Sequence, residues 1–354
     1  MDRREFLRTS LIVTGGAVIG SATAGLGAPP RGGAGGAGGA GGTGGGGIPE
    51  PPPGKSTVAI CRDTRLETQE EAQQDPTIKY LVHLGVQSAV GGATAVAAWQ
   101  KLFKPKDIVA VKLSCLAPQF APHPAIVEAI IVGLRSWDIP EQNIILYDKE
   151  DRDLAGAGYE LNATGKGVQC YGTLGGPNEP GYEERFTLKG DTSFCLSKIV
   201  TRTATAIINV PVVKHHEYAG MSCALKNHFG SINNPSKFHM IGGCNPAVAD
   251  VNRALDLRSK QRLVICDALQ IMFDRGPSFH AECVMPYDAV LVSKDPVALD
   301  YQAMQLIEAS RKTKGLCPLS EVKYPPLHVA TAAGYELGTN DPAKINLAVH
   351  NFGG

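Results

Sequence analysis

The chain has 354 residues, and its 34 acidic and 34 basic side chains leave no net charge at neutral pH. A balanced charge gives no long-range attraction to nucleic acid or to anionic lipid, which argues against both as partners. The nine cysteines include no Cys-x-x-Cys pair, so their spacing supports neither a zinc ribbon nor an iron–sulfur cluster.

Residues 1–28 are expected to be an export signal rather than part of the fold. Arg3 and Arg4 precede Phe6 and Leu7, and an uncharged stretch rich in Gly, Ala and Thr follows from 11 to 27. Paired arginines in this setting are typical of a leader that is recognised by the twin-arginine translocation machinery. We therefore predict a periplasmic or extracytoplasmic protein, held at the membrane only if the leader stays uncleaved.

Residues 29–54 are predicted to form a linker. The stretch 32–47 is almost entirely Gly and Ala, which cannot bury apolar surface, and 49–53 adds a stiff polyproline-like step. The remaining residues, 55–354, are expected to fold as a single α/β domain.

Strand-like and helix-like segments alternate through this domain, and their spacing is typical of βαβ units. The sequence therefore predicts a mostly parallel or mixed sheet flanked by helices, with a small irregular or antiparallel insert at 151–200. Strands are expected at 56–61, 107–113, 143–147, 204–213, 262–266, 289–292 and 345–350. Helices are expected at 77–90, 93–103, 125–137, 246–255 (with Asn245 as N-cap), 295–307 and 327–334.

The stretch 214–239, KHHEYAGMSCALKNHFGSINNPSKFH, concentrates the titratable side chains of the chain. It follows TATAIINVPVV, which is typical of a buried strand. Open α/β sheets usually place their binding sites at the carboxyl ends of such strands. We therefore expect the functional site here.

Polar residues close three of the other predicted strands or begin the loop after them. Lys112 closes DIVAVKL, Asp148 follows NIILY and Asp267 follows LVIC, while Lys214 follows the strand before the histidines. The carboxyl ends of parallel strands lie along one edge, so these four side chains are expected to converge. Each aspartate taken singly could equally cap the loop that follows it.

A helix over 220–229 would place Cys223, Lys226 and Asn227 on one face, with His228 well round from them. Lys226 and Asn227 could then hold an anionic ligand, or could simply hydrogen-bond a loop. For Cys223 we favour a buried core position over a reactive thiol.

Adjacent His215 and His216 would point to opposite faces of a strand, so one of them is expected to face the site. A metal centre could combine one of them with His228 or His239, since imidazoles bind zinc, copper, iron and nickel. No HExxH-type pair fixes the spacing. Farther along, Asp295 and Pro296 are typical of a helix start, and Asp300, one turn in, could face the site.

Together these segments resemble the protein family called domain of unknown function 362. The similarity extends from about Val58 to Asp341. The matching pieces are VAVKLS with His123-Pro124, the strand-end Asp148, INVPVVKHHEYAGMSCALKNHFGSI, VICDA, VSKDPVALD and AAGYELGTND. The resemblance implies an α/β protein of poorly defined biochemistry. Many relatives are described as iron–sulfur proteins because they carry a ferredoxin-type cysteine run, and this chain lacks that run.

The first family motif usually reads Lys-Pro-Asn, whereas this chain has Lys112-Leu113-Ser114. A hydroxyl therefore replaces an amide at the third position, and any ligand contact made there would change.

Two functions remain open from the sequence. The first is an exported protein that binds a metal or a small anionic ligand at the sheet edge, with redox or acid–base activity possible. The second is a non-catalytic binding or accessory protein for an exported redox enzyme. For the first, catalysis is assigned to Lys226 and His228. Ligand binding is assigned to Lys112, Lys214, Asn227, Asp148 and Asp300, and metal binding to His215, His216, His239 and Asp267.

Overall fold

The computed structural model describes residues 48–353 apart from 70, 177–180 and 240–241. The expected export signal and most of the linker therefore lie outside the described residues. The last part of the predicted linker contacts the folded part, because Ile48 packs against the core and Glu50 pairs with Lys101 at 3.0 Å. Within the described ranges, no single helix has the length and apolar composition of a membrane span. Two consecutive helices, Gln74–Val90 and Ala95–Leu102, have that length and composition only when they are taken together, and they are bent by 58° at the break between them.

One mixed sheet of ten strands forms the centre of the described structure. Its main path is β12–β1–β11–β10–β7–β2–β3–β4, and β8 with β9 extends it from β10. Neighbours are parallel except where β11 meets β1 and β10 and where β9 meets β8. The strands are β1 (Ser56–Asp63), β2 (Val109–Lys112), β3 (Ile144–Tyr147), β4 (Gln169–Cys170), β7 (Ala206–Asn209), β8 (Val212–His216), β9 (Gly220–Ser222), β10 (Gln261–Met272), β11 (Val284–Ser293) and β12 (Ile345–Phe352). The predicted mixed α/β fold is confirmed.

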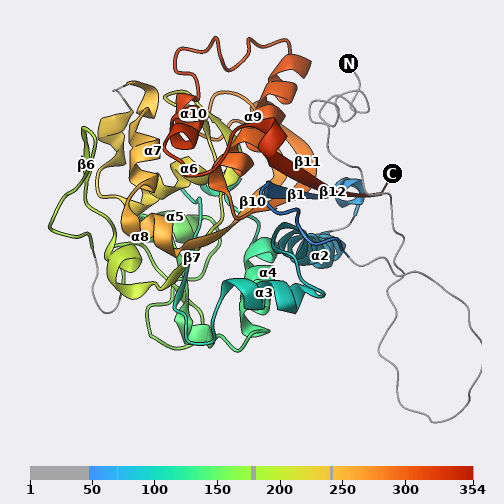
Figure 1. Cartoon of the computed structure of the whole chain (residues 1–354), viewed down its shortest axis with the longest axis vertical. Helices are drawn as coiled ribbons and strands as arrows, with labels where there is room; N and C mark the ends of the chain where they lie inside the picture. Colours follow the sequence, from blue (N-terminus) through green and yellow to red (C-terminus); the bar gives the residue numbers. More distant parts are fainter. Residues whose placement is uncertain (1–47, 70, 177–180, 240–241, 354) are drawn as a thin grey trace, which may run out of the picture.

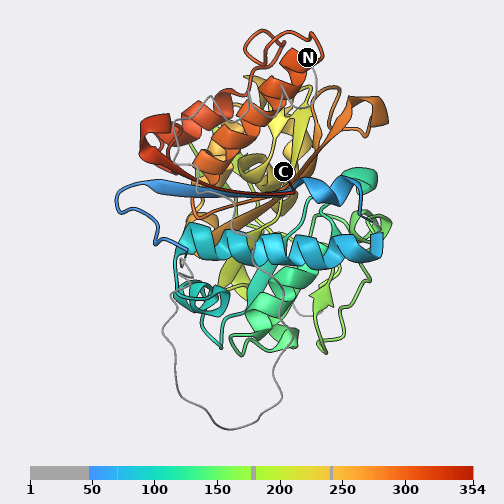
Figure 2. The same cartoon turned by 90° about the vertical axis from the view of Figure 1, so that its right-hand side faces the viewer.

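Helices cover both faces of this sheet, as Figure 2 shows from the side. One face shares a core with α2, α3 and α4, and the other shares a core with α6, α7, α9 and α10. The helices are α2 (Glu71–Val90), α3 (Ala95–Leu102), α4 (Pro124–Arg135), α5 (Asp151–Gly156), α6 (Ala224–Asn227), α7 (Ala247–Asn252), α8 (Leu255–Lys260), α9 (Pro296–Thr313) and α10 (Leu327–Gly334). Because each face is covered, β2 and β3 are buried at every position, which explains their unbroken apolar sequences.

The predicted start of α9 is confirmed. Asp295 caps the helix by accepting hydrogen bonds from the N–H groups of Val297 and Ala298, and Pro296 follows at the first helical position. Asn245, by contrast, is not the cap of α7: Pro246 holds that place without a side-chain cap, and the expected single helix is divided between α7 and α8.

The run predicted as one strand, 204–213, is broken into β7 and β8. The break falls at Val210 and Pro211, and proline has no N–H to continue a ladder of hydrogen bonds. Consequently β7 pairs with β2, whereas β8 pairs with β9 and with a later part of β10. This bend brings the residues of β8 beyond the carboxyl end of β2.

Two more predictions are wrong. The segment 220–229 is not one helix, since β9 occupies 220–222 and only Ala224–Asn227 form α6 before a 3₁₀ turn at His228–Ser231. Asp267 does not end its strand, because β10 continues to Met272 by pairing with β11. The insert does contain the expected antiparallel element, a hairpin of β5 (Thr187–Lys189) and β6 (Thr192–Phe194), with β6 at the periphery in Figure 1.

Candidate functional site

A cavity of about 270 Å³ lies where β2, β3 and β8 end; we call it the lysine cavity. It is lined by Lys112, Ser114, Leu116, Asp148, Lys149, Glu150, Arg152, Asp153, Lys214, His216, Ser222, Lys226, Asn227, Phe229, Gly230, Pro235, Ser236, His239 and Pro277. Three of the four strand-end residues predicted to converge, Lys112, Asp148 and Lys214, therefore lie on one cavity. Lys226 and Asn227 join them from α6.

The floor of the lysine cavity is a buried ion pair. Lys112 Nζ lies 2.7 Å from Asp148 Oδ1, and it also donates to the carbonyl of Leu113 at 2.5 Å. Asp148 accepts two further hydrogen bonds, from the backbone N–H groups of Cys115 and Lys149, each at 2.7 Å. The charges of this pair compensate each other, so the pair gives the cavity shape rather than net charge.

Asn227 joins this floor to the strand beside it. Its Oδ1 accepts from Lys112 Nζ at 3.2 Å, and its Nδ2 donates to the Lys112 carbonyl at 3.2 Å and to Asn209 Oδ1 at 2.8 Å. Both ends of the amide are engaged within the protein. Asn227 therefore positions Lys112. Its amide has little hydrogen-bonding capacity left for the ligand that it was predicted to bind.

Lys214 and Lys226 are the cations that are not neutralised here. Their side chains are buried, with residue exposures of 3% and 7%, and neither forms an ion pair with a carboxylate in the described part of the chain. Burial lowers the pKa of each lysine to about 8. The lysine cavity thus holds two amines without a directly paired carboxylate among the described residues, and the charge of Asp148 offsets the burial of Lys214 only in part.

Two imidazoles line the same cavity beside Lys226. The rings of His216 and His239 stack with centroids 5.2 Å apart, and their Nε2 atoms lie 2.9 Å and 3.3 Å from Lys226 Nζ. Burial, followed by the charge of Lys226, lowers the pKa of His239 to about 4 and that of His216 further still. Both rings are therefore neutral, and the amine occupies the position that a shared metal ion would take.

The structure does not bring the four predicted metal ligands together. His215 points away from His216, toward Asp274, with 3.9 Å between Nε2 and Oδ1. Asp267 lines a different cavity. Within the described ranges no three His, Cys, Asp or Glu side chains are grouped to hold a metal ion.

Two other predicted site residues lie in the interior, away from the lysine cavity. His228 is fully buried, with Nε2 2.7 Å from Gln261 Oε1 and Nδ1 3.2 Å from Ser231 Oγ. Asp300, also fully buried, accepts hydrogen bonds from the N–H groups of Ala224 and Leu225 at 2.6 Å and 3.0 Å. These contacts give Asp300 a structural function at the start of α6, and burial raises its pKa to about 7.

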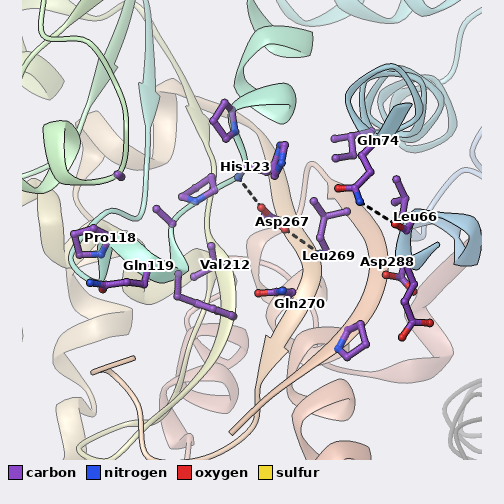
Figure 3. A pocket seen from close by; sticks show the side chains of 18 residues that line it. Leu66, Gln74, Pro118, Gln119, His123, Val212, Asp267, Leu269, Gln270 and Asp288 are labelled. Atoms are coloured by element: carbon purple, nitrogen blue, oxygen red, sulfur yellow. Dashed lines mark hydrogen bonds between the residues drawn. The ribbon is translucent and has the colours of Figure 1, made fainter. Parts of the chain in front are cut away.

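A second cavity, of about 440 Å³, surrounds Asp267, and we call it the Asp267 cavity (Figure 3). Asp267 accepts hydrogen bonds from the backbone N–H groups of His123 and Leu269, at 2.7 Å and 2.9 Å. Figure 3 shows Gln74, Gln119 and Gln270 around it. Burial raises the pKa of Asp267. The two backbone contacts fit a carboxylate that holds the loop before α4 against β10.

Sequence reasoning missed several residues of the lysine cavity. Ser222 lies on β9 directly across from Lys214, and Gly230 packs against Lys112 and Asp148. Phe229 places its ring 5.0 Å from Lys226 Nζ. No local pattern marks these residues. The motif departure at Ser114 was the one available signal, and its side chain does line the cavity.

The fold and this site define an α/β protein with a lysine-lined cavity at the carboxyl edge of a mixed sheet. The family profile described as "Domain of unknown function (DUF362)" matches residues 109–305, more than half of the chain. The chain therefore belongs to that family, and the match includes every strand that lines the cavity.

One solved structure that the chain matches is a crystal structure of a protein from Thermotoga maritima. It has 11% sequence identity and a TM-score of 0.40, and the match covers 68% of this chain and 59% of that one. This chain thus spans less than two thirds of that protein's length. No curated protein matches the chain.

Proposed function

We propose that this chain is an exported protein whose lysine cavity binds a small anionic ligand, a carboxylate or a phosphate. The observation that carries this proposal is the burial of Lys214 and Lys226, neither of which forms an ion pair with a carboxylate of the described residues. Removing a charge from water is costly unless an opposite charge accompanies it. A bound anion would supply that opposite charge. Its binding would therefore be strengthened by offsetting the cost of burying the lysines.

The other groups on the cavity wall suit the same ligand class. Ser114 and Ser222 offer hydroxyl donors, and a volume of about 270 Å³ fits a molecule with few heavy atoms. The metal alternative is less well supported, because the two imidazoles in the cavity direct Nε2 toward the Lys226 amine. An anion is therefore the ligand class that we favour.

Acid–base chemistry on the bound anion is the activity that the site supports best. A lysine whose pKa is lowered to about 8 exchanges a proton near physiological pH, and Lys226 has this property. His216 and His239 lie within hydrogen-bonding distance and could relay that proton. In this proposal Lys226 is the proton-transfer group and Lys214 binds the anion.

A binding experiment with the full chain tests the proposal. Inorganic phosphate, acetate and succinate would be titrated into the protein by isothermal calorimetry. We expect at least one of them to bind with a single site, and Lys214→Met to weaken that binding by about tenfold or more. Lys166→Met, which changes an exposed lysine, should bind as the wild type does. Absence of binding, or binding that survives Lys214→Met, would contradict an anion site here.

A non-catalytic accessory function is the second candidate, and one observation favours it. Phe186 and Leu188 are 64% and 67% exposed beside the β5–β6 hairpin, and their two-residue spacing places them on one side. If this face binds a partner, Phe186→Ser with Leu188→Ser should abolish co-purification with that partner. Anion binding in the lysine cavity should be unchanged in the same variant.

Export by the twin-arginine machinery is part of the proposal and rests on the leader sequence. Replacing Arg3 and Arg4 by lysine keeps the charge but removes the recognised pair. We expect this variant to accumulate in the cytoplasmic fraction, whereas the wild type is recovered outside the cytoplasm. Equal distribution of the two proteins would contradict this route.

A further inference from the structure

The Lys226 amine lies in a site made of rings. His216 Nε2 is 2.9 Å from Nζ, His239 Nε2 is 3.3 Å away, and the centroid of Phe229 is 5.0 Å away. No carboxylate pairs with this lysine among the residues that the structure describes. An ammonium group would therefore be buried against aromatic and neutral imidazole surfaces.

The hydrogen bond at Nδ1 of His216 determines which nitrogen of this ring carries the hydrogen. The backbone N–H of Tyr218 donates to His216 Nδ1 at 3.2 Å, so Nδ1 must present its lone pair. A neutral imidazole with a free Nδ1 carries its hydrogen on Nε2. That Nε2–H group faces Lys226 Nζ, and it needs an acceptor there.

An ammonium group has three donors and no acceptor, whereas a free amine has one lone pair. The hydrogen bond between His216 and Lys226 is therefore complete when Lys226 is an uncharged amine. Such an amine can still donate one N–H to His239 Nε2. His216 therefore stabilises the uncharged amine, which is the reactive form of a lysine, and its lone pair attacks an electrophile once it turns away from the His216 N–H.

We propose that Lys226 is a nucleophile that forms an imine with the carbonyl carbon of a small 2-oxo acid. This proposal rests on the anion-binding function proposed above and specifies its ligand. Lys214, the other buried lysine without a carboxylate partner in the described ranges, binds the carboxylate of the oxo acid. Lys214 and Lys226 both line the same small cavity.

The chemistry needs no oxidant, reductant or metal. The nitrogen lone pair of Lys226 forms a bond to the carbonyl carbon, and the carbonyl π electrons move to oxygen. One proton of the amine is transferred to that oxygen, which gives a carbinolamine. The hydroxyl group then leaves with the second amine proton as water, and a C=N bond remains. His216 and His239, both next to Nζ, are placed to carry these protons.

Reductive trapping of the full chain tests the proposal. Pyruvate and sodium cyanoborohydride convert an imine into a stable secondary amine, which adds a carboxyethyl group to the lysine. We expect one adduct per chain, located at Lys226 by peptide mass spectrometry. Lys226→Arg should reduce labelling at least tenfold while keeping a long cationic side chain. Lys226→Met serves the same purpose if the arginine variant does not fold.

Two further measurements separate the possible failures. Calorimetric binding of pyruvate without an adduct, or adducts spread over exposed lysines such as Lys166, would overturn the imine and leave the anion site standing. Absence of any binding by pyruvate, acetate or phosphate would overturn both proposals. Acetate, which has a carboxylate and no ketone, should protect Lys226 from labelling in proportion to its occupancy of the cavity.

Discussion

Lys112 Nζ lies 2.7 Å from Asp148 Oδ1, and both side chains are almost completely buried at the carboxyl ends of β2 and β3. Neither residue can lose its partner without leaving a charge in the interior. Breaking a buried pair typically costs more free energy than replacing both members by apolar groups.

Lys112→Met should therefore lower the free energy of unfolding by about 3–5 kcal/mol, measured by urea denaturation. The double variant with Asp148→Asn should recover part of that loss, because no buried charge remains. The exposed-lysine control Lys166→Met should stay within about 0.5 kcal/mol of the wild type. A Lys112→Met protein as stable as the control would show that this pair is not a structural element.

Gly230 is required because the Lys112–Asp148 pair packs against it. A Cβ at this position would lie 2.5 Å from Asp148 Oδ1 and 2.6 Å from Lys112 Nζ. Gly230→Ala should destabilise the protein by about 1–3 kcal/mol and weaken anion binding, because the added methyl group displaces the pair into the cavity. Gly334→Ala is the matched control, since a Cβ there would meet nothing within 4 Å. Equal denaturation midpoints for the two variants would contradict this packing.

Anion affinity should depend on pH through the two unpaired lysines. Burial lowers the pKa of Lys214 and of Lys226 to about 8. Affinity should be highest below this value, where the anion-binding Lys214 is charged, and should fall as the pH rises through about 8. Asp148, Cys115 and Lys112 also act on Lys214, and of these Lys112 lowers its pKa.

Calorimetric titrations at several pH values check this dependence. Lys214→Arg should retain affinity at higher pH, because a guanidinium group stays charged. Affinity that is constant across the alkaline range in the wild type would contradict the assignment of lysines as the binding groups.

Asp300 should make the stability of the protein depend on pH on the acidic side of neutrality. Burial raises its pKa from 3.8 to about 7 in the folded protein. Its contribution to stability is complete below about 4 and is lost as the pH rises toward about 7, because the folded state must then bury a carboxylate. Relative to Asp300→Asn, the wild type should lose stability across this range in chemical denaturation. A difference that stays constant with pH would contradict the raised pKa.

Cysteine reactivity should be confined to one residue. All nine cysteines lie in the described part of the chain, and eight are buried while Cys317 is exposed. Burial also raises the pKa of Cys223 and of Cys266, so little thiolate forms there. Iodoacetamide should alkylate Cys317 at least ten times faster than any other cysteine in the native protein. All nine should react in urea, and rapid native labelling of Cys223 would contradict its burial.

Much of the fold could be predicted because β-branched apolar runs and helix caps are local signals. Strands such as β2 and β3 are buried on both faces, and their sequences are apolar throughout. The end of β10 was missed because its second half depends on pairing with β11, a contact between distant residues. Pro211, which lies between β7 and β8, is the local signal for their division.

The residues of the site were likewise predictable where local sequence determines their position, and not where contacts between distant residues do. Parallel pairing implies that Lys112, Asp148 and Lys214 share an edge, and they do line one cavity. His216 lies two residues after Lys214 on β8 and lines the cavity with it, whereas His215 is directed toward Asp274. His228 is buried with its Nε2 against Gln261, which is 33 residues away in the chain. No local pattern reports such a contact.

The chain between β2 and α4 borders both cavities. Ser114 and Leu116 line the lysine cavity, and 118–124 line the Asp267 cavity. The N–H of Cys115 is held by Asp148 and that of His123 by Asp267, so this segment is fastened at each end to a buried carboxylate. A molecule that moves one end acts on the other through only a few peptide units. We therefore expect a compound bound around Asp267 to change the affinity of the lysine cavity.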